Sequence, residues 1–554
     1  MTPTSRSKST WALGAALLAF VAGRCLVPMD ETDLFYNLRL GDIVLATHAV
    51  PRTNLLSFTY PDHPDPNLAW IFQILLALAY RWGGIAGTVL LKTLFVLTTF
   101  ALLYRAAIRR GAHPFVAAAA LALAAWAAEP RFVERPHLIT FLGLATTLLA
   151  LERAEAGRPR LLWALVPLGL VWANGNSCLF LAPALLLLYS LGARIDSAAA
   201  ETRRASRRAA AVAVALIPLL FATPSGSGWI GYVANHFRMP SLRPLQEYRT
   251  AEWPTDGPFL FLLLAVALAT ILPAGAATAP VPVAATGTVT VVEAPRSGFM
   301  RHLLPVLALA VLGSRRIRFV AEFSLFAGPF VAARASELVR RRGARRPPRP
   351  WLDRAARWTV GLGLAAMTIL PRWGTGRPID LGVEDGLVPV ADIQWIDAHG
   401  LRERMYNDLE VGSYLAWQGA WPGGAGARVF QDPRINGYPA ALHAILRRSD
   451  LRPDEWEDLL ARFETRSALI TFPDVNPRAA LFSPERWALV HQTSDALVFA
   501  RREPRHAALI AADELPLTFR FDPATGVEVV PLEFPPACSP VRACEWQRRL
   551  AAWF

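Results

Sequence analysis

Long apolar runs, separated by short charged loops, occupy roughly the first 370 residues of the chain. A membrane-spanning helix needs roughly 20 apolar residues, within a range of about 17–25. The pattern therefore predicts about eleven transmembrane helices. The candidate spans lie near residues 10–29, 84–105, 113–128, 137–152, 161–174, 177–193, 208–223, 258–274, 302–314, 317–335 and 355–371. Between two of them, residues 276–298 are low in complexity and are expected to form a flexible inner loop.

The distribution of basic residues predicts which loops face the cytoplasm, because loops rich in Lys and Arg are retained on that side. Arg6 and Lys8 precede the first span, so we place the N-terminus inside, and residues 30–66 then form an external loop. Residues 68–82 are also apolar, but counting them as a span would put the basic segment 105–110 outside. We therefore expect an interfacial or re-entrant helix at 68–82. The basic loops that then fall inside are residues 105–112, 153–160, 194–208 and 335–354.

Strand-like stretches alternate with helical ones after Val388, which is typical of a small α/β sheet domain. The strands are expected at Arg404–Asp408, Arg428–Asp432, Ala468–Phe472 and Ala496–Arg501. The helices are expected at Ala391–His399, Gly437–Leu446 and Asp454–Phe463. We therefore predict a polytopic α-helical transmembrane domain over residues 1–375 and a soluble α/β domain over residues 376–554, on the external, periplasmic side.

The composition agrees with a membrane protein and argues against a nucleic-acid-binding protein. Of the 554 residues, 53% are hydrophobic and 18% are charged, whereas a soluble protein carries about a quarter charged residues. The net charge of +13 does not indicate nucleic-acid binding, because the arginines gather in loops between spans, as topology signals do. We expect membrane lipids as partners, and the C-terminal domain leaves room for protein partners.

The four cysteines give one conditional prediction. Cys25 and Cys178 lie in or beside apolar runs and are expected to pack as small hydrophobic residues. Cys538 and Cys544 flank a short loop and could form a disulfide if their domain is exported, or stay as thiols in the cytosol. No zinc-type spacing of Cys and His occurs in the sequence.

Ionisable residues gather at span ends on the predicted external face, and at such positions they suggest function. The first external loop contributes Asp30, Glu31 and Asp33, which are candidate catalytic bases. The candidate substrate-binding residues are Arg131, Glu134, Arg135 and His137 in EPRFVERPH, Asn174 in WANGNS, and Arg315, Arg316 and Arg318 in SRRIR. Arginine binds phosphate bidentately, so this set suits a lipid-phosphate sugar donor. A divalent metal is also compatible with carboxylate and phosphate oxygens.

Each of these groups has a plainer interpretation. The acidic residues could form a solvated helix start with a capping role. The arginines could anchor the chain at lipid headgroups. His137 could be a polar residue at a helix start, and Asn174 could belong to a turn.

The same stretches resemble a group of bacterial polytopic proteins related to the GT-C glycosyltransferases, membrane enzymes that use polyprenyl-phosphate sugars. Members often carry Asp-x-Asp-Leu-Trp-Trp-His-Leu-x-x-Gly after the first helix, and residues 31–41 of the chain are ETDLFYNLRLG. Further matches, in order, are PRFVERPH, WAN at Trp172–Asn174, SRRIRF, MYNDLEVGSYLAW and VFQDPR. The resemblance implies a GT-C-like fold in a bacterial inner membrane, and an essential acidic residue in the first external loop that maps onto Asp33.

The chain departs from the group's pattern at three positions, and this keeps more than one function open. Asn37 and Asn176 stand where His is common, and Ala69 stands where Glu is common. The first hypothesis is an inverting glycosyltransferase that uses a lipid-linked sugar at the external membrane surface. The second is a non-catalytic subunit or scaffold of an envelope or other membrane complex, which the lost ionisable groups favour. A transporter of a lipid-linked substrate is less favoured, because no internal repeat is evident.

Overall fold

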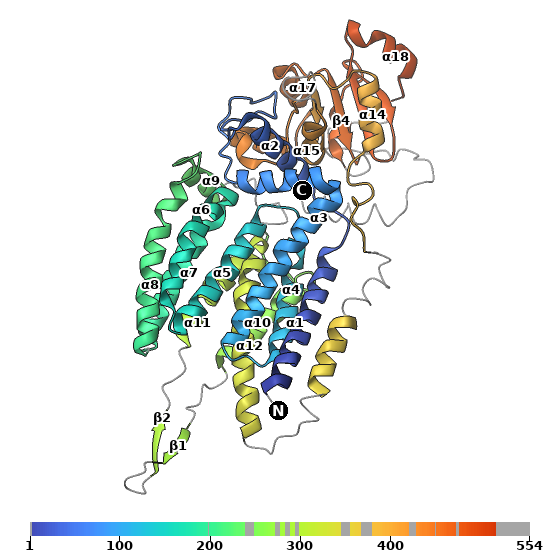
Figure 1. Cartoon of the computed structure of the whole chain (residues 1–554). Coiled ribbons are helices and arrows are strands. Elements are labelled where there is room, and N and C mark those ends of the chain that lie inside the picture. The colour runs from blue at the N-terminus through green and yellow to red at the C-terminus, as the bar shows by residue number, and fades with distance from the viewer. Residues whose placement is uncertain are drawn as a thin grey trace. The chain divides into compact units, whose positions relative to one another are not determined.

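The computed structural model divides the chain into two compact units (Figure 1). The helical unit comprises Met1–Pro28, Ile85–Thr223 and Glu247–Gly382, and the mixed unit comprises Met29–Gly84, Pro224–Gln246 and Val383–Phe554. The structure describes residues 3–197, 199–238, 249–271, 278–282, 289–293, 299–344, 355–366, 379–419, 428–448, 450–472 and 476–516. Cys538 and Cys544 lie outside these residues. Residues 29–84, which include the acidic loop, thus belong to the same compact unit as the C-terminal region.

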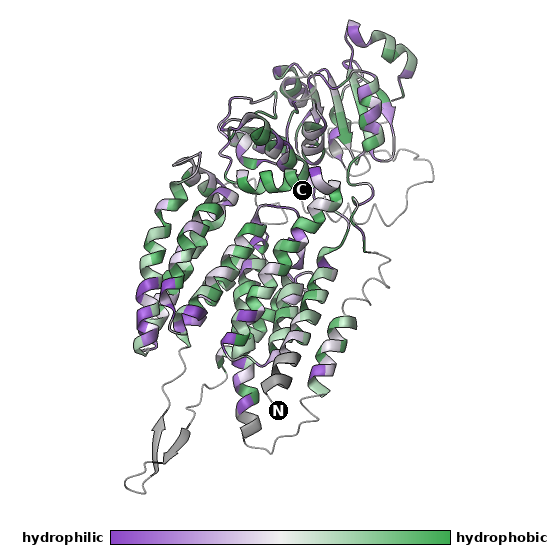
Figure 2. Ribbon diagram, in the orientation of Figure 1, coloured by the Kyte–Doolittle hydropathy of each residue, from purple (hydrophilic) through white to green (hydrophobic). Residues whose placement is uncertain are grey.

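The helical unit is built from α-helices joined by short 3₁₀ turns. Its helices are α1 (Pro3–Cys25), the part of α3 (Trp70–Arg109) from Ile85 onward, α4 (Pro114–Ala128), α5 (His137–Glu155), α6 (Leu165–Gly175), α7 (Leu181–Ile195), α8 (Ala200–Leu216), α10 (Gly257–Ile271), α11 (Met300–Arg315) and α12 (Val320–Ala344). Its 3₁₀ turns are η1 (Glu129–Arg131), η2 (Pro159–Ala164), η3 (Ser177–Phe180), η4 (Pro218–Phe221) and η7 (Ile317–Phe319). Figure 2 shows hydrophobic colour along most of these helices and hydrophilic colour mainly toward their ends.

Among the described residues, three helices are long and apolar enough to cross a membrane. They are Trp70–Arg109, His137–Glu155 and Ser177–Ile195, and two shorter apolar helices are Thr10–Cys25 and Gly257–Ile271. This indicates a membrane location, but the expected count of about eleven spans is not reached. Prolines and 3₁₀ turns interrupt several candidates: residues 161–174 are divided between η2 and α6, and residues 208–223 end in η4.

Close helix packing in the helical unit depends on small residues. A Cβ added at Gly328 of α12 would meet the Cβ of Ala124 in α4 at 2.9 Å. A Cβ added at Gly143 of α5 would meet the Trp172 ring at 2.3 Å. Small residues at such contacts are typical of membrane helices, whose association relies on close van der Waals packing. The alanine-rich sequence of α4 therefore serves packing, and Cys25 and Cys178 are buried free thiols, as expected.

Helix α3 is broken at a pair of glycines. Gly83 has φ −143° and ψ 20°, and Gly84 has φ 58° and ψ −145°, both outside the helical region. Gly84 needs a residue without a Cβ, because its φ lies in the left-handed region. The break separates Trp70–Trp82, in the mixed unit, from Ile85–Arg109, in the helical unit. The expected interfacial helix at 68–82 thus exists as a separate helical segment, and its place in the membrane stays a prediction.

The mixed unit contains a four-stranded sheet with the strand order β3-β4-β6-β5. Its strands are β3 (Met405–Asn407), β4 (Ser467–Thr471), β5 (Trp487–Gln492) and β6 (Ala496–Arg501). Its helices are α2 (Asp33–Thr47), the first part of α3, α9 (Gly228–Arg238), α14 (Val390–Ala398), α15 (Leu409–Gln418), α16 (Ala440–Leu446), α17 (Pro453–Arg462) and α18 (Ala507–Asp513). The 3₁₀ turns η8 (Ile435–Gly437), η9 (Pro477–Leu481) and η10 (Pro504–His506) complete it. β3 pairs with β4 in parallel, and the other two pairings are antiparallel.

Two strand predictions need correction. The expected strand at Arg428–Asp432 forms only an isolated bridge between Val429 and Ser57, and β5 was not predicted. Residues 278–282 and 289–293, expected within a flexible loop, form an antiparallel pair, β1 (Thr278–Pro282) and β2 (Val289–Glu293). The β-branched residues of VTVVE in β2 favour an extended backbone, which explains this difference.

An aromatic core fixes the sheet region of the mixed unit. Trp456 of α17 lies edge-on to Tyr406 of β3, with ring centroids 4.8 Å apart. Phe482 stacks on Phe499 of β6 with centroids 4.3 Å apart, and Trp487 of β5 lies edge-on to Phe482. Buried aromatic residues of this size contribute much of the stability of a small domain. The core therefore holds rigidly the loops and helix starts that carry the polar residues described next.

Candidate functional site

The acidic sequence of the first loop lies at the start of α2. The Asp33 backbone N–H donates to the Glu31 carboxylate at 3.1 Å, and Asp33 itself is buried. The Thr32 hydroxyl donates to Oε2 of Glu410 at 3.2 Å, and Glu410 lies in the first turn of α15. Carboxylates at a helix N-terminus interact favourably with the helix dipole. Glu31 therefore fits the plainer capping interpretation, whereas Glu410 is a carboxylate that the sequence did not single out.

Farther along α2, Asn37 takes part in a series of hydrogen bonds between buried polar side chains. The Asn37 side chain donates to the Asp33 carbonyl at 2.8 Å and accepts from Gln73 at 3.1 Å. The Asn67 side chain donates to Gln73 at 2.7 Å. All three amides are buried, and a buried polar group needs such partners. Asn37, which replaces the usual His of the resembling group, is thus held in a structural network that fixes the start of α2.

Other residues of the ETDLFYNLRLG stretch hold α2 against α15 and α3. Arg39 donates to the carbonyls of Ala416 at 2.9 Å and Trp417 at 2.5 Å, at the C-terminal end of α15, where cations are favoured. Phe35 packs edge-on against Tyr414 at a centroid distance of 4.9 Å. A Cβ added at Gly41 would meet the Gln73 carbonyl oxygen at 2.2 Å, so only glycine allows this contact. Most residues of this stretch therefore fix the position of α2, and only its acidic start is left as a candidate for catalysis.

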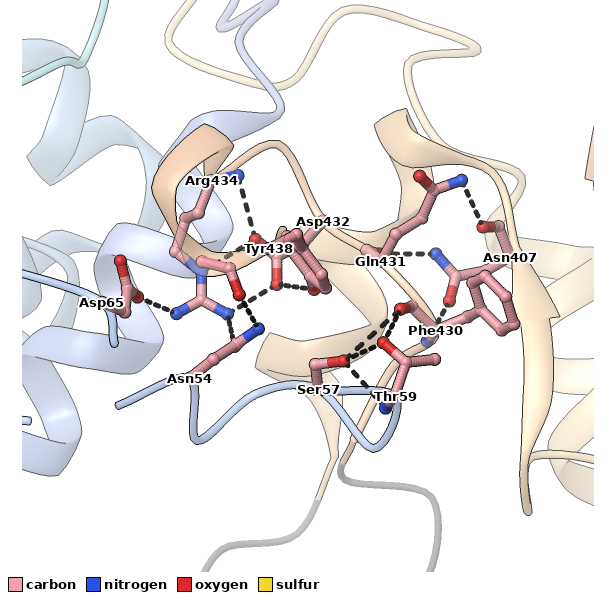
Figure 3. Close-up of polar contacts among 11 residues, drawn as sticks. Asn54, Ser57, Thr59, Asp65, Asn407, Phe430, Gln431, Asp432, Arg434 and Tyr438 are labelled. Atoms are coloured by element: carbon pink, nitrogen blue, oxygen red, sulfur yellow. Dashed lines mark hydrogen bonds and ion pairs between the residues drawn. The ribbon is translucent and has the colours of Figure 1, made fainter. Parts of the chain in front are cut away.

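Figure 3 shows a second group, in which the VFQDPR stretch contacts residues 54–65. Arg434 donates to Asp432 through Nε at 2.8 Å and Nη2 at 2.7 Å, and to Asp65 at 2.6 Å. Its Nη2 also donates to Asn54, and the Tyr438 hydroxyl donates to Asp432 at 2.8 Å. Burial raises the pKa of Asp65, although the charge of Arg434 opposes this. The group is a closed, hydrogen-bonded structural contact, and Asn54 and Asp65 were not predicted.

The MYNDLEVG stretch is also structural at its centre. Asp408 Oδ2 accepts from the Thr471 backbone N–H and the Asn476 side chain, both at 2.8 Å. Asp408 Oδ1 accepts from Arg478 and from the Tyr406 hydroxyl, both at 3.1 Å. Burial and this carboxylate raise the pKa of Tyr406. Asp408 therefore fixes the start of α15, the helix that carries Glu410.

In the helical unit, the EPRFVERPH turn forms a compact polar cluster. Arg131 and His137 are buried, with Nη2 of Arg131 3.3 Å from Nδ1 of His137. His137 Nε2 lies 2.7 Å from the Arg131 carbonyl oxygen. The Cys178 thiol lies within electrostatic range of Arg131, Arg318 and Glu322. The structure therefore brings the EPRFVERPH turn and the SRRIRF turn to one neighbourhood, next to η3.

Glu134 has a partner that sequence reasoning missed. Its carboxylate lies 2.8 Å from Nζ of Lys92 in α3, and the two side chains are 1% and 2% exposed. Cys25 lies within electrostatic range of both. A single lysine in the middle of an apolar run is itself a signal, because ionisable residues in spans are expensive and need partners. Lys92 therefore holds the ERPH part of the turn.

The remaining predicted residues lie in two kinds of environment. Asn174 donates to the carbonyls of Leu170 and Ala222, both at 2.9 Å, as expected of a turn. Asn176 accepts from the Thr140 hydroxyl at 2.9 Å. Arg315 is exposed. The other three predicted arginines, Arg135, Arg316 and Arg318, are half-buried.

The candidate residues thus fall into two sets. Asp30, Glu31 and Asp33 belong to the mixed unit, and the arginine-bearing turns belong to the helical unit. A cavity shared by both sets is therefore a prediction. Within the described residues, no group of three or more His, Cys, Asp or Glu side chains is arranged to hold a metal ion, so the divalent metal has no ligand set among them.

Comparisons with known proteins support the fold. No protein-family model and no curated protein matches the chain. A crystal structure of the Archaeoglobus fulgidus oligosaccharyltransferase tethered with an acceptor peptide is similar, with a TM-score of 0.51 and 10% identity, over 89% of this chain and 74% of that chain. The same organism's oligosaccharyltransferase AglB, in complex with an inhibitory peptide and a dolichol-phosphate, gives a TM-score of 0.50 and 11% identity, over the same shares. The chain thus shares the fold of these oligosaccharyltransferase structures, which agrees with the fold that the sequence resemblance implies.

Proposed function

We propose that the chain is a membrane glycosyltransferase that uses a polyprenyl-phosphate-linked sugar at the external face of a bacterial inner membrane. The observation that carries the proposal is that Arg131 and Arg318, from two different turns of the helical unit, both act electrostatically on the buried Cys178 thiol. Arginine side chains at such a position would bind the donor phosphate and stabilise the charge that develops on the leaving group. The structure of AglB with dolichol-phosphate shows that a protein of similar fold takes a lipid phosphate.

In this proposal Asp33 is the base that takes the proton from the acceptor hydroxyl, or orients it. The proposal includes about eleven spans, a cytoplasmic N-terminus and a periplasmic C-terminal domain.

The test is sugar transfer by the purified full-length protein from a panel of polyprenyl-phosphate sugars. Asp33→Ala should lower turnover by roughly 100-fold or more, because a general base contributes about that much. Arg131→Gln and Arg318→Gln should weaken donor binding as well. Asp42→Asn is the matched control, because Asp42 is an exposed carboxylate on the same helix and pairs with Arg81.

A non-catalytic membrane subunit is the second candidate, and one observation favours it. Asn37 and Asn176, which stand where the resembling group has His, are both held in hydrogen bonds with neighbouring side chains. A protein that has lost catalysis could keep such residues for structure alone. This candidate predicts no transfer and no donor binding across a broad panel, and no difference between wild type and Asp33→Asn.

A further inference from the structure

Four arginines, the arginine cluster, lie together where α3 and α5 end: Arg105 and Arg109 of α3, Arg153 of α5 and Arg158 in the turn that follows α5. A buried ion pair between Arg110 and Glu152 joins the ends of the two helices. Gly157 has φ 84° and turns the chain back, so the Arg158 N–H donates to the Arg153 carbonyl oxygen at 3.0 Å. The other three arginines all act electrostatically on Arg153. The fold therefore holds four like charges at one place.

The acidic residues beside the arginine cluster are paired with other groups. Glu152 binds Arg110, and Glu155 binds Arg301 through Nε at 2.7 Å and Nη2 at 3.0 Å. Among the described residues, no carboxylate forms an ion pair with an arginine of the cluster, and Nε of Arg153 is buried without a hydrogen-bond partner. A buried donor needs an acceptor, and arginines four residues apart on a helix repel one another. The cluster thus lacks an anion that the described part of the chain does not supply.

An exposed apolar face of α3 leads to the arginine cluster. Leu90 and Leu94 are 40% and 61% exposed, and Arg105 lies three helical turns after Leu94 on the same face. Val96 and Phe100, on the other face, are fully buried. In a segment long and apolar enough to cross a membrane, such an exposed face meets the acyl chains of lipids. The cluster therefore stands where the acyl chains of a lipid join its headgroup.

The arginine cluster is separate from the proposed donor site. His137 begins α5, and Arg153 lies sixteen residues later, which is about 24 Å along a helix that rises about 1.5 Å per residue. The basic loops 105–112 and 153–160 both fall on the cytoplasmic side in the predicted topology. An anion bound at the cluster therefore comes from the cytoplasmic leaflet or the cytosol, and not from the donor at the external face.

We propose that the arginine cluster binds the phosphate of an anionic phospholipid, such as phosphatidylglycerol, in the cytoplasmic leaflet. Guanidinium groups bind phosphate oxygens bidentately, and basic pockets between membrane helices on the cytoplasmic side bind such headgroups. A zwitterionic headgroup carries a cation that four arginines repel, so a headgroup with a net negative charge is favoured. The apolar face of α3 argues for a lipid, because it offers acyl chains a contact that free phosphate cannot use.

The test is a titration of the purified full-length protein with phosphatidylglycerol, phosphatidylcholine or glycerol phosphate, followed by native mass spectrometry, which resolves each bound molecule. The Arg109→Gln/Arg158→Gln variant should bind phosphatidylglycerol roughly 30-fold more weakly, because each arginine near an anionic lipid contributes about five-fold. The matched control is Arg204→Gln/Arg207→Gln, at two exposed arginines of α8 on the same predicted side. This control should bind phosphatidylglycerol as wild type does.

Thermal unfolding gives a second measurement. Without lipid, Arg153→Gln should melt no lower than wild type, since the substitution removes repulsion between like charges. Phosphatidylglycerol should raise the melting temperature of this variant less than that of wild type, because a ligand stabilises the folded state that binds it. A lower melting temperature of the lipid-free variant would overturn the proposal by showing that Arg153 has a structural role instead.

The titration can overturn the proposal in three further ways. Equal weakening in the α8 control would show diffuse attraction to all basic loops. Phosphatidylcholine that binds as tightly as phosphatidylglycerol, or the absence of any bound phosphatidylglycerol, would exclude a site for anionic lipid. Glycerol phosphate that binds as tightly as the lipid would show that the apolar face of α3 contributes nothing. No sugar donor enters these measurements, so their outcome is independent of the proposed transferase activity.

Discussion

Buried charge is arranged differently in the two units. In the mixed unit, Arg434 meets Asp432 through two parallel hydrogen bonds and also holds Asp65 (Figure 3). In the helical unit, Lys92 meets Glu134 as a point charge between apolar helices. The planar guanidinium fixes directions, whereas the ammonium group supplies charge on a flexible stem. The first arrangement fastens two distant stretches of chain together, and the second neutralises a carboxylate that could not stay charged alone in the membrane.

The comparison predicts its largest effect at Arg434. Arg434→Ala leaves Asp432 and Asp65 buried without their cation, which should lower the free energy of unfolding by about 3–5 kcal/mol. Hydrogen–deuterium exchange of peptides covering residues 52–66 and 428–446 should then increase together. Arg448→Ala, at an exposed ion pair with Glu455, is the control and should leave stability almost unchanged, because solvent screens exposed ion pairs. Unchanged exchange in Arg434→Ala would mean that the cluster does not fasten the loop.

Lys92→Met should have the next largest effect, about 3 kcal/mol, because it leaves Glu134 buried without a partner. The buried thiol of Cys25 lies within electrostatic range of this pair, so its labelling rate is a native reporter of local opening. Labelling should accelerate in Lys92→Met and return toward the wild-type rate in the double variant Lys92→Met/Glu134→Leu, which replaces the ion pair by apolar side chains. A double variant no better than the single one would contradict charge neutralisation as the role of Lys92.

A smaller effect is expected at the contact between α2 and α3. Gly41→Ala must push the Gln73 carbonyl away, because the added Cβ would lie 2.2 Å from its oxygen, and should cost about 1–3 kcal/mol. Gly231→Ala in α9 is the control, because no atom lies within 4 Å of its added Cβ. Thermal unfolding of the full-length protein measures both. Equal melting temperatures for the two variants would show that α2 can shift without loss.

The smallest effect is the pH dependence that His443 gives the mixed unit. Burial lowers the pKa of His443, whose Nε2 lies 3.0 Å from the Ile435 carbonyl oxygen. The unfolded chain therefore binds a proton below about pH 6.5 that the folded unit does not, so stability falls as pH falls through that range. The slope is at most about 1.4 kcal/mol per pH unit for one proton. His443→Asn should flatten it in denaturant titrations at several pH values.

Local pattern predicted much of the fold. The pattern of apolar residues predicted most helices of the helical unit, and three of the four sheet strands overlap their predicted ranges. The interruption of α3 at Gly83 and Gly84 falls where the arginine distribution separated the 68–82 segment from the next span. These features depend on residues close together in the sequence, so periodicity and turn residues are enough to find them.

The long-range contacts could not be predicted in the same way. Asn54 binds Gly437 across 383 positions, and Arg39 binds carbonyls at the end of α15 across similar distances, but no local pattern records either pairing. The motif around Asp33 was singled out for chemistry, yet its Asn37, Arg39 and Gly41 serve packing. Lys92 was missed because one charge barely changes the mean hydropathy of a long apolar helix.

The contact between Asn54 and Gly437 also has a consequence for synthesis in the cell. Residues 52–66 leave the ribosome hundreds of residues before their partners, with most of the hydrophobic segments translated in between. At about 5–20 residues per second, this delay lasts roughly 20–80 s. During that time the nascent loop can form only the contacts within itself, such as those of Asn54 with His63 and of Asp65 with Arg52, and lacks its contact with Gly437. A premature stop codon anywhere before residue 428 would remove these partners, and the loop would then keep only its internal contacts.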